Sequence, residues 1–245
     1  MTDAKPDNHP FLEFLVAFNH DLRTPLNSII GFSRVILKGI DGPINDVQAE
    51  DLASIHDGGQ NMLAMLNEVV DMAKLETGAI DLLCKTLDLR EIIDDTVNKV
   101  ESLVEDKAVT FNVELPPEPL PVWGDESRTR QILFNLASFC ARNLRAGAVT
   151  LQANAWGDRA RIIVSDNGEG WPPEEVAVML QPYRPPAEIQ HIGGAGLSLA
   201  IAQRMAELQG GSLAVESHVG RGTTFTLVLP LKPGDASAAK DHRLA

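Results

Sequence analysis

Cysteine and basic residues are both scarce in this chain of 245 residues. Its two cysteines, Cys84 and Cys140, lie far apart without metal-ligand spacing, which indicates buried thiols in a reducing compartment rather than disulfides or a metal site. Lysine and arginine number 21 against 34 aspartate and glutamate residues, a formal net charge of −13. Proteins that bind nucleic acid concentrate basic residues on one face. The composition therefore predicts no nucleic acid partner.

Long apolar runs are absent as well. No run reaches the roughly 18 residues that a membrane span needs, and the first ten residues lack the charged and apolar regions of a signal peptide. We therefore expect a cytoplasmic chain without a membrane segment. The composition, 44% hydrophobic and 22% charged, is typical of a folded globular protein, and the length allows one large domain or two smaller ones.

Apolar residues recur at steps of three and four over residues 11–36 and again over 52–75, the spacing of a helical stripe. Between them, two glycines and a proline interrupt the pattern at residues 38–46. The sequence thus predicts an antiparallel helical hairpin. Two helices bury only one narrow seam, so the remaining apolar positions predict a homodimer in which two hairpins form a four-helix bundle.

The remainder of the chain has the pattern of an α+β domain. Apolar and β-branched runs predict strands, and periodic segments between them predict helices that cover one face of a mixed, mainly antiparallel sheet. The expected strands are 109–115, 148–156, 159–166 and 223–230, and the expected helices are 89–107, 126–145, 173–180 and 197–209. Residues 233–245 are expected to form a disordered tail.

Three glycine-rich stretches occur in this second part, at residues 166–170, 193–201 and 220–225. Glycines let the backbone approach a ligand closely, and the second stretch runs into a helix whose first N–H groups could bind an anion such as phosphate. Asp166 ends an apolar strand, where a carboxylate needs a donor. The exocyclic amine of adenine is such a donor.

These motifs carry a family resemblance. "HDLRTP" on the hairpin, followed in order by "DNGEG", "GGAGLSL" and "GRGTTF", resembles the H, G1, G2 and G3 boxes of the sensor histidine kinases of two-component signalling. The resemblance implies a dimerisation and histidine-phosphotransfer hairpin over residues 10–78 and an ATP-binding catalytic domain, an α/β sandwich, over residues 84–232.

The resemblance also assigns roles to residues of the hairpin. His20 is expected to accept the γ-phosphoryl group of ATP and to pass it to an aspartate in the receiver domain of a response regulator. Asp21 would hold the proton on the other ring nitrogen of His20, because an imidazole attacks only through an unprotonated nitrogen. Thr24, one turn later, would orient a hydrolytic water in a phosphatase reaction.

In the second part, the resemblance implies a site for ATP and Mg²⁺. Asp166 would contact adenine, Thr223 would lie near the base, and the glycines would shape the pocket. The expected nucleotide-binding residues are Asn135, Arg142, Asp166, Gly168, Gly170, Gly194, Gly196 and Thr223.

Pro25 is unusual because a proline inside a helix normally costs about 3 kcal/mol. Its missing N–H deprives the carbonyl of Asp21 of a helical partner, so the helix is expected to bend just beyond His20. We predict that this bend allows the two halves of the hairpin to tilt between a state that engages the ATP domain and one that releases it.

One position departs from the family pattern. The N-box of these kinases carries a second asparagine that supplies an oxygen to Mg²⁺, and Phe139 stands at that position. Phenylalanine cannot coordinate a metal, and Asn143, one turn on, would substitute only in part. Two hypotheses follow: an ATP-dependent histidine kinase, of reduced activity, or a degenerate kinase that acts as a dimeric regulatory scaffold or phosphatase with weak or no use of ATP.

Overall fold

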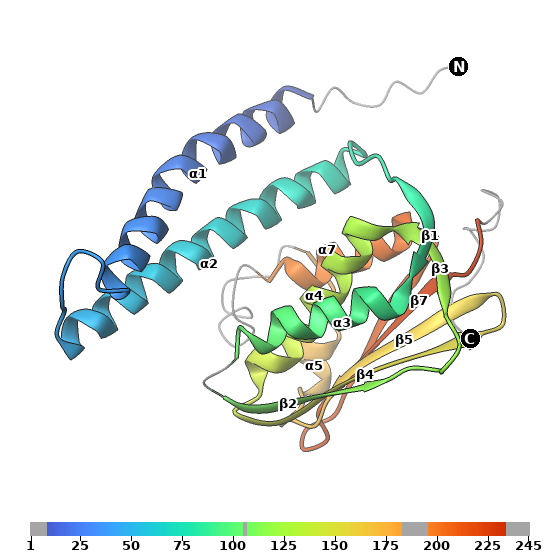
Figure 1. The fold of residues 1–245 in the computed structure, drawn as a ribbon. Helices are drawn as coiled ribbons and strands as arrows, with labels where there is room; N and C mark the ends of the chain where they lie inside the picture. Colours follow the sequence, from blue (N-terminus) through green and yellow to red (C-terminus); the bar gives the residue numbers. More distant parts are fainter. Residues whose placement is uncertain (1–8, 105–106, 183–195, 234–245) are drawn as a thin grey trace. The chain divides into compact units, whose positions relative to one another are not determined.

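The computed structural model describes residues 9–104, 107–182 and 196–233. The chain divides into two compact units, with the division between Ile80 and Asp81 (Figure 1). The expected tail from residue 234 onward and the expected site residue Gly194 lie outside the described residues.

The first unit is a helical hairpin, as the sequence predicts. Helix α1 spans His9–Leu37 and helix α2 spans Asp46–Glu76. Helix α2 begins with a capping box: Asn45 accepts a hydrogen bond from the backbone N–H of Gln48, and the Gln48 side chain accepts one from the backbone N–H of Asn45. These reciprocal bonds satisfy two backbone donors that a helix start leaves open.

The seam of the hairpin follows a seven-residue repeat on α1. Leu12, Asn19, Leu26 and Ser33 are its buried residues, so apolar and polar positions alternate along the helix. On α2, Gly59 allows close approach, since a Cβ there would lie 2.9 Å from Cγ1 of Ile30. The helices therefore meet closely at this level, which a side chain at position 59 would prevent.

Many large apolar side chains of the hairpin stay exposed in the single chain, which is unusual for so many residues on two helices. On α1 they are Phe11, Phe14, Val16, Phe18, Ile29 and Phe32, and on α2 Val47, Ile55, Met62, Met65 and Val69. Their three- and four-residue spacing places most of them in stripes along each helix.

The second unit contains a five-stranded sheet in the order β2-β4-β5-β7-β6 and a two-stranded antiparallel sheet of β1 and β3. Only β2 and β4 pair in parallel, so the larger sheet is mixed and mainly antiparallel, as predicted. The strands are β1 Cys84–Asp88, β2 Ala108–Glu114, β3 Pro121–Asp125, β4 Ala146–Trp156, β5 Arg159–Asp166, β6 Ser212–Ser217 and β7 Thr223–Pro230.

Helices cover one face of the larger sheet (Figure 1). They are α3 Leu89–Glu101, α4 Glu126–Asn143, the short α5 Pro173–Val176, and α7 Ser198–Leu208. The core lies between these layers, where residues such as Leu133, Ile162 and Phe225 have no exposed surface. No helix among the described residues has the length and apolar character to cross a membrane.

The prediction of secondary structure was wrong in several places. Helix α3 ends at Glu101 rather than at residue 107, and α5 ends at Val176 rather than at 180. Strands β1, β3 and β6 were not predicted.

Candidate functional site

His20 lies on α1 and is open to solvent. The side chains of His20 and Asp21 are 79% and 82% exposed, and Nδ1 of His20 lies 3.4 Å from Oδ1 of Asp21. This arrangement favours the tautomer with the proton on Nδ1, which leaves Nε2 with a free lone pair. Thr24 is also exposed, and its carbonyl accepts a hydrogen bond from Oγ of Ser28 at 3.2 Å. The three predicted residues therefore share an accessible stretch of one helix.

Two hydrogen bonds tie this stretch of α1 to α2. Nδ2 of the buried Asn19 donates to the carbonyl of Leu66 at 2.9 Å, and Nη2 of Arg23 donates to Oδ1 of Asn67 at 3.0 Å. Asn19 and Arg23 are one turn apart on the same face. They lie on either side of His20 in the sequence. Their bonds to α2 fix how α1 is rotated about its own axis at the histidine. The apolar spacing did not predict these contacts. Asn19, a polar residue at a position of the helical seam, was the signal in the sequence that could have indicated them.

Asp166 is fixed at the end of β5 by its own loop. Its Oδ1 accepts a hydrogen bond from the backbone N–H of Gly168 at 2.8 Å. A Cβ on Gly168 would lie 2.8 Å from Cδ2 of Leu144 and 2.9 Å from Oδ1 of Asp166. Only glycine fits there without displacing the carboxylate, which explains this member of the first glycine stretch.

The first and third glycine stretches pack directly against each other. A Cβ on Gly170 would collide with the carbonyl oxygen of His218, and one on Gly222 would collide with that of Asp166. Both glycines have positive φ, +65° and +79°. The backbone N–H of Gly220 also donates to the carbonyl of Glu169 at 2.6 Å. Close packing of the two loops therefore accounts for glycine at these positions, independently of any ligand.

Thr223 is buried beside this loop contact. Its Oγ1 lies 3.2 Å from Oγ of Ser217, which donates to the carbonyl of Gly222 at 2.8 Å and accepts from the backbone N–H of Trp171 at 2.9 Å. Ser217, which the sequence did not single out, thus joins the two loops. Thr223 belongs to this polar cluster, and its role near a base stays a prediction.

Helix α4 supplies two further predicted residues. Nδ2 of Asn135 donates to the carbonyl of Ser198 at 2.9 Å, so its amide holds the first residue of α7. Gly196, which precedes that helix, has a φ of +68° that favours glycine. Arg142 lies near the end of α4 and is exposed, and its carbonyl accepts from Nζ of Lys107 at 2.7 Å. Contacts of these residues with a nucleotide stay predictions.

Phe139, at the position of the metal-binding asparagine in the family pattern, lies in an aromatic cluster. Its ring is only 7% exposed and packs edge-on against Phe225, with 5.5 Å between centroids, and at 5.9 Å from Trp171. Asn143 is exposed and donates through Nδ2 to the carbonyl of Phe139 at 2.8 Å. In the part of the chain that the structure describes, no group of three or more histidine, cysteine or acidic residues could hold a metal. Phe139 therefore offers no side-chain oxygen to a Mg²⁺ ion at the N-box.

Cys140, the next residue of α4, contacts Asp166. The thiol is fully buried, and burial, followed by the charge and hydrogen bonding of Asp166, raises the pKa of Cys140 well above its usual range. The thiol therefore stays protonated near neutral pH and can donate to the Asp166 carboxylate. Together with Gly168, Cys140 holds this carboxylate in place.

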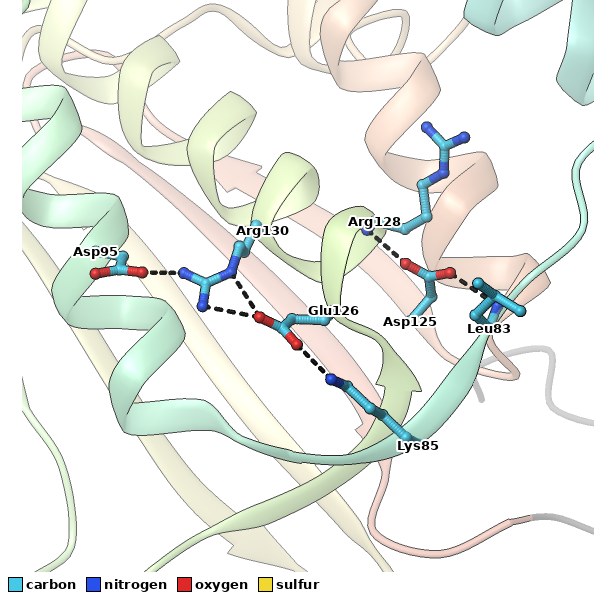
Figure 2. A network of polar contacts seen from close by, with 7 residues as sticks. All are labelled: Leu83, Lys85, Asp95, Asp125, Glu126, Arg128 and Arg130. Carbon is cyan, nitrogen blue, oxygen red and sulfur yellow. Dashed lines mark hydrogen bonds and ion pairs between the residues drawn. The ribbon is translucent and has the colours of Figure 1, made fainter.

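A separate polar network lies between α3 and α4 (Figure 2). Glu126 accepts from Lys85 at 2.6 Å and from Nη2 of Arg130 at 3.1 Å, and Arg130 also pairs with Asp95. The hydrogen bond from Lys85, and then that from Arg130, lowers the pKa of Glu126. Asp95, Glu126 and Arg130 line a hollow of about 680 Å³ together with Lys99.

Asp125 stands at the edge of the same network (Figure 2) and starts α4. Its Oδ1 accepts from the backbone N–H of Arg128 at 3.0 Å as the helix cap, and its Oδ2 accepts from the backbone N–H of Leu83 at 2.8 Å. Its own N–H donates to Oε1 of Gln209 at 2.8 Å. This buried residue thereby fixes the start of α4, the helix that carries Asn135.

An exposed histidine and carboxylate on a helical hairpin, followed by an α/β unit with glycine loops around a strand-end aspartate, define a phospho-acceptor module joined to a nucleotide-binding module. Family models agree with both assignments. The "His Kinase A (phospho-acceptor) domain" matches residues 12–78, and the "Histidine kinase-, DNA gyrase B-, and HSP90-like ATPase" matches residues 124–233.

The chain belongs to the sensor histidine kinases of two-component systems. It is 34% identical to the histidine protein kinase DivJ of Caulobacter vibrioides over 89% of this chain and 37% of that protein. It is also 34% identical to the circadian input-output histidine kinase CikA of Synechococcus elongatus, over 89% of this chain and 30% of that protein. The chain thus spans about a third of the length of these curated relatives.

A solved structure of full-length ShkA in complex with AMPPNP is similar to this chain, with a TM-score of 0.71, 28% identity and coverage of 89% of this chain and 45% of that one. The match to the ATPase family model supports ATP as the ligand of the second unit.

Proposed function

We propose that this chain is the catalytic core of a sensor histidine kinase that phosphorylates itself on His20 with ATP and passes the phosphoryl group to an aspartate of a response regulator. The phosphotransfer hairpin would comprise residues 10–78 and the catalytic domain residues 84–232. The observation that carries the proposal is His20 itself, exposed on α1 with Asp21 Oδ1 at 3.4 Å from its Nδ1.

The chemistry follows from this geometry. Nε2 of His20 attacks the γ-phosphorus, a P–N bond forms, and the bond from that phosphorus to the bridging oxygen breaks, so ADP leaves. Asp21 holds the Nδ1 proton and stabilises the positive charge that develops on the ring. In the second step, a carboxylate of a receiver domain attacks the phosphorus and releases neutral imidazole.

The catalytic domain would bind ATP through the predicted residues of α4, the glycine loops and β7. Asp166, held by Gly168 and Cys140, would accept the hydrogen bond of the adenine amine. Thr24, exposed one turn beyond His20, would orient a water for dephosphorylation of the regulator. The exposed apolar stripes of the hairpin support a homodimer.

A second candidate is favoured by Phe139. Because this residue lies in an aromatic cluster where the family pattern has a metal-binding asparagine, the chain could act as a dimeric regulatory scaffold or as a phosphatase with weak or no use of ATP.

Labelling with γ-³²P-ATP separates the two candidates. The kinase predicts an acid-labile phosphohistidine on the wild-type chain, which His20→Gln abolishes and which a receiver domain removes. Asp166→Asn should weaken ATP binding about 10- to 100-fold, because hydrogen bonds to charged groups contribute about 1.5–3 kcal/mol. Binding of ATP without any label on His20 would instead support the scaffold.

A further inference from the structure

We infer that the nucleotide site binds adenine nucleotides with an affinity that does not depend on a divalent cation, because a packed aromatic cluster holds the residue that stands where the family pattern has a metal-binding asparagine. The inference rests on the proposed function only in taking an adenine nucleotide as the ligand.

The aromatic cluster consists of Phe139, Trp171 and Phe225. These residues come from α4, from the segment after the first glycine stretch and from β7, which are the elements that carry the predicted nucleotide-binding residues. Phe139 sits between the other two rings, edge-on to Phe225 at 89° and tilted by 37° to Trp171. The phenylalanine is therefore part of a packed cluster that joins three segments of the second unit.

Such a cluster cannot serve a hard cation. Mg²⁺ requires oxygen ligands in near-octahedral geometry, and apolar rings offer none while they raise the cost of a nearby charge. The amide of Asn143 is bonded to the Phe139 carbonyl at the end of the helix. The cation that a nucleotide carries in water thus gains no side-chain ligand from position 139 when the nucleotide binds.

The other side of the site remains polar. Asp166 is held by Gly168 and Cys140, and its carboxylate would accept the hydrogen bond of an adenine amine. Arg142 follows Phe139 by three residues and so shares its face of α4, and it is exposed. A guanidinium is a permanent cation with a planar fork that matches phosphate oxygens. Arg142 would therefore meet the phosphate charge directly, without a metal between them.

The test compares dissociation constants of the full chain for ADP, AMPPNP and adenosine by calorimetry, with 5 mM Mg²⁺ and with EDTA. We expect the wild-type constants for ADP and AMPPNP to differ by less than about twofold between the two conditions. A loss of tenfold or more in EDTA would overturn the inference. This measurement requires no variant.

Variants then locate the cause. Phe139→Asn should create a dependence on Mg²⁺ of fivefold or more, whereas Phe134→Asn, the same change on the same helix outside the aromatic cluster, should create none. Phe139→Leu, which preserves an apolar side chain, should bind as the wild type does in EDTA. Arg142→Gln should weaken ADP about tenfold and leave adenosine unchanged, and an unchanged ADP constant would contradict the role given to Arg142.

The outcomes separate this inference from the proposed kinase. Metal-independent binding without phosphohistidine would support the inference and refute the kinase. Normal labelling of His20 combined with Mg²⁺-dependent binding would support the kinase and refute the inference. Failure of all three ligands to bind in either condition would refute both.

Discussion

At the scale of single residues, the Asp166 carboxylate is held by neighbouring groups of the chain itself. The backbone N–H of Gly168 bonds to one of its oxygens, and the buried thiol of Cys140 interacts with the carboxylate. Glycine at 168 is required because a side chain there would collide with Leu144 and with the carboxylate itself. The carboxylate therefore has fixed partners within the chain.

Cys140 gives a prediction for alkaline pH. Burial, and then Asp166, raises the pKa of this thiol in the folded state. A group whose pKa is higher in the folded state stabilises the fold below its unfolded pKa, about 8.5, and that contribution is lost as the pH rises toward the folded value. The wild type should therefore lose up to about 1.4 kcal/mol per pH unit above pH 8.5 from this one group.

Thermal unfolding between pH 7 and pH 10.5 tests this expectation. Cys140→Ala should lower Tm at pH 7 and flatten its decline at alkaline pH. The pKa of Cys84 is also raised, by burial and then by Asp125, but this thiol is only partly buried. Cys84→Ala should therefore flatten the curve less. Parallel curves for the wild type and Cys140→Ala would contradict the prediction.

At the scale of elements, α1 continues from His9 to Leu37 through Pro25. The proline has no N–H for the carbonyl of Asp21, so the helix lacks one internal hydrogen bond within a turn of His20. Meanwhile Asn19 and Arg23 bond across to α2. The segment around His20 thus has fewer hydrogen bonds within α1 and is bonded to α2. These are the properties expected of a place where the hairpin bends.

Replacement of Pro25 tests this role. Pro25→Ala should stabilise α1 by up to about 3 kcal/mol and raise the Tm of the hairpin. It should leave the dissociation constant for ADP unchanged and shift the ratio of kinase to phosphatase activity, because the two activities need different tilts of the hairpin. Pro43→Ala, in the loop between the helices, serves as the control. An unchanged ratio in Pro25→Ala would refute the role of the bend.

The sequence revealed elements with strong periodicity and missed those without it. The stripe of α1 and the apolar run of β5 were found, but β1 and β3 have five residues each and β6 has six, too short for a clear alternation. The predicted end of helix α3 is too late because Leu103 and Val104 continue the apolar spacing. In the structure they lie in the turn that follows Ser102.

The same reasoning explains which residues of the candidate site could be predicted from the sequence. His20 and Asp166 belong to sequence motifs whose residue types indicate a chemical role directly. Ser217 and Asn19 act through hydrogen bonds to backbone groups distant in sequence, which no local pattern encodes. That Gly170 shapes a nucleotide pocket stays a prediction, and its close approach to His218 is by itself sufficient to require glycine.

At the scale of the whole molecule, the hairpin exposes apolar side chains that a single chain leaves uncovered. Phe14 and Phe32 are 60% and 69% exposed, and Ile55 and Met62 on α2 are 50% and 55% exposed. Contiguous apolar surface of this kind marks an interface, since its burial contributes roughly 25 cal/mol per Å². A second hairpin carries the same stripes, so a two-fold bundle would cover both sets at once.

We predict that a change at one residue would break the proposed dimer. Phe32→Glu would place a carboxylate in the apolar interface at a cost of about 3 kcal/mol or more, so the dimer dissociation constant should rise at least about 100-fold. Val219→Glu is the control, because Val219 is equally exposed, at 70%, but lies in the second unit. Analytical ultracentrifugation of the full chain should show a dimer for the wild type and the control, and a monomer for Phe32→Glu at micromolar concentration. A dimer that persists in Phe32→Glu would place the interface elsewhere, and circular dichroism distinguishes its loss from unfolding of the hairpin.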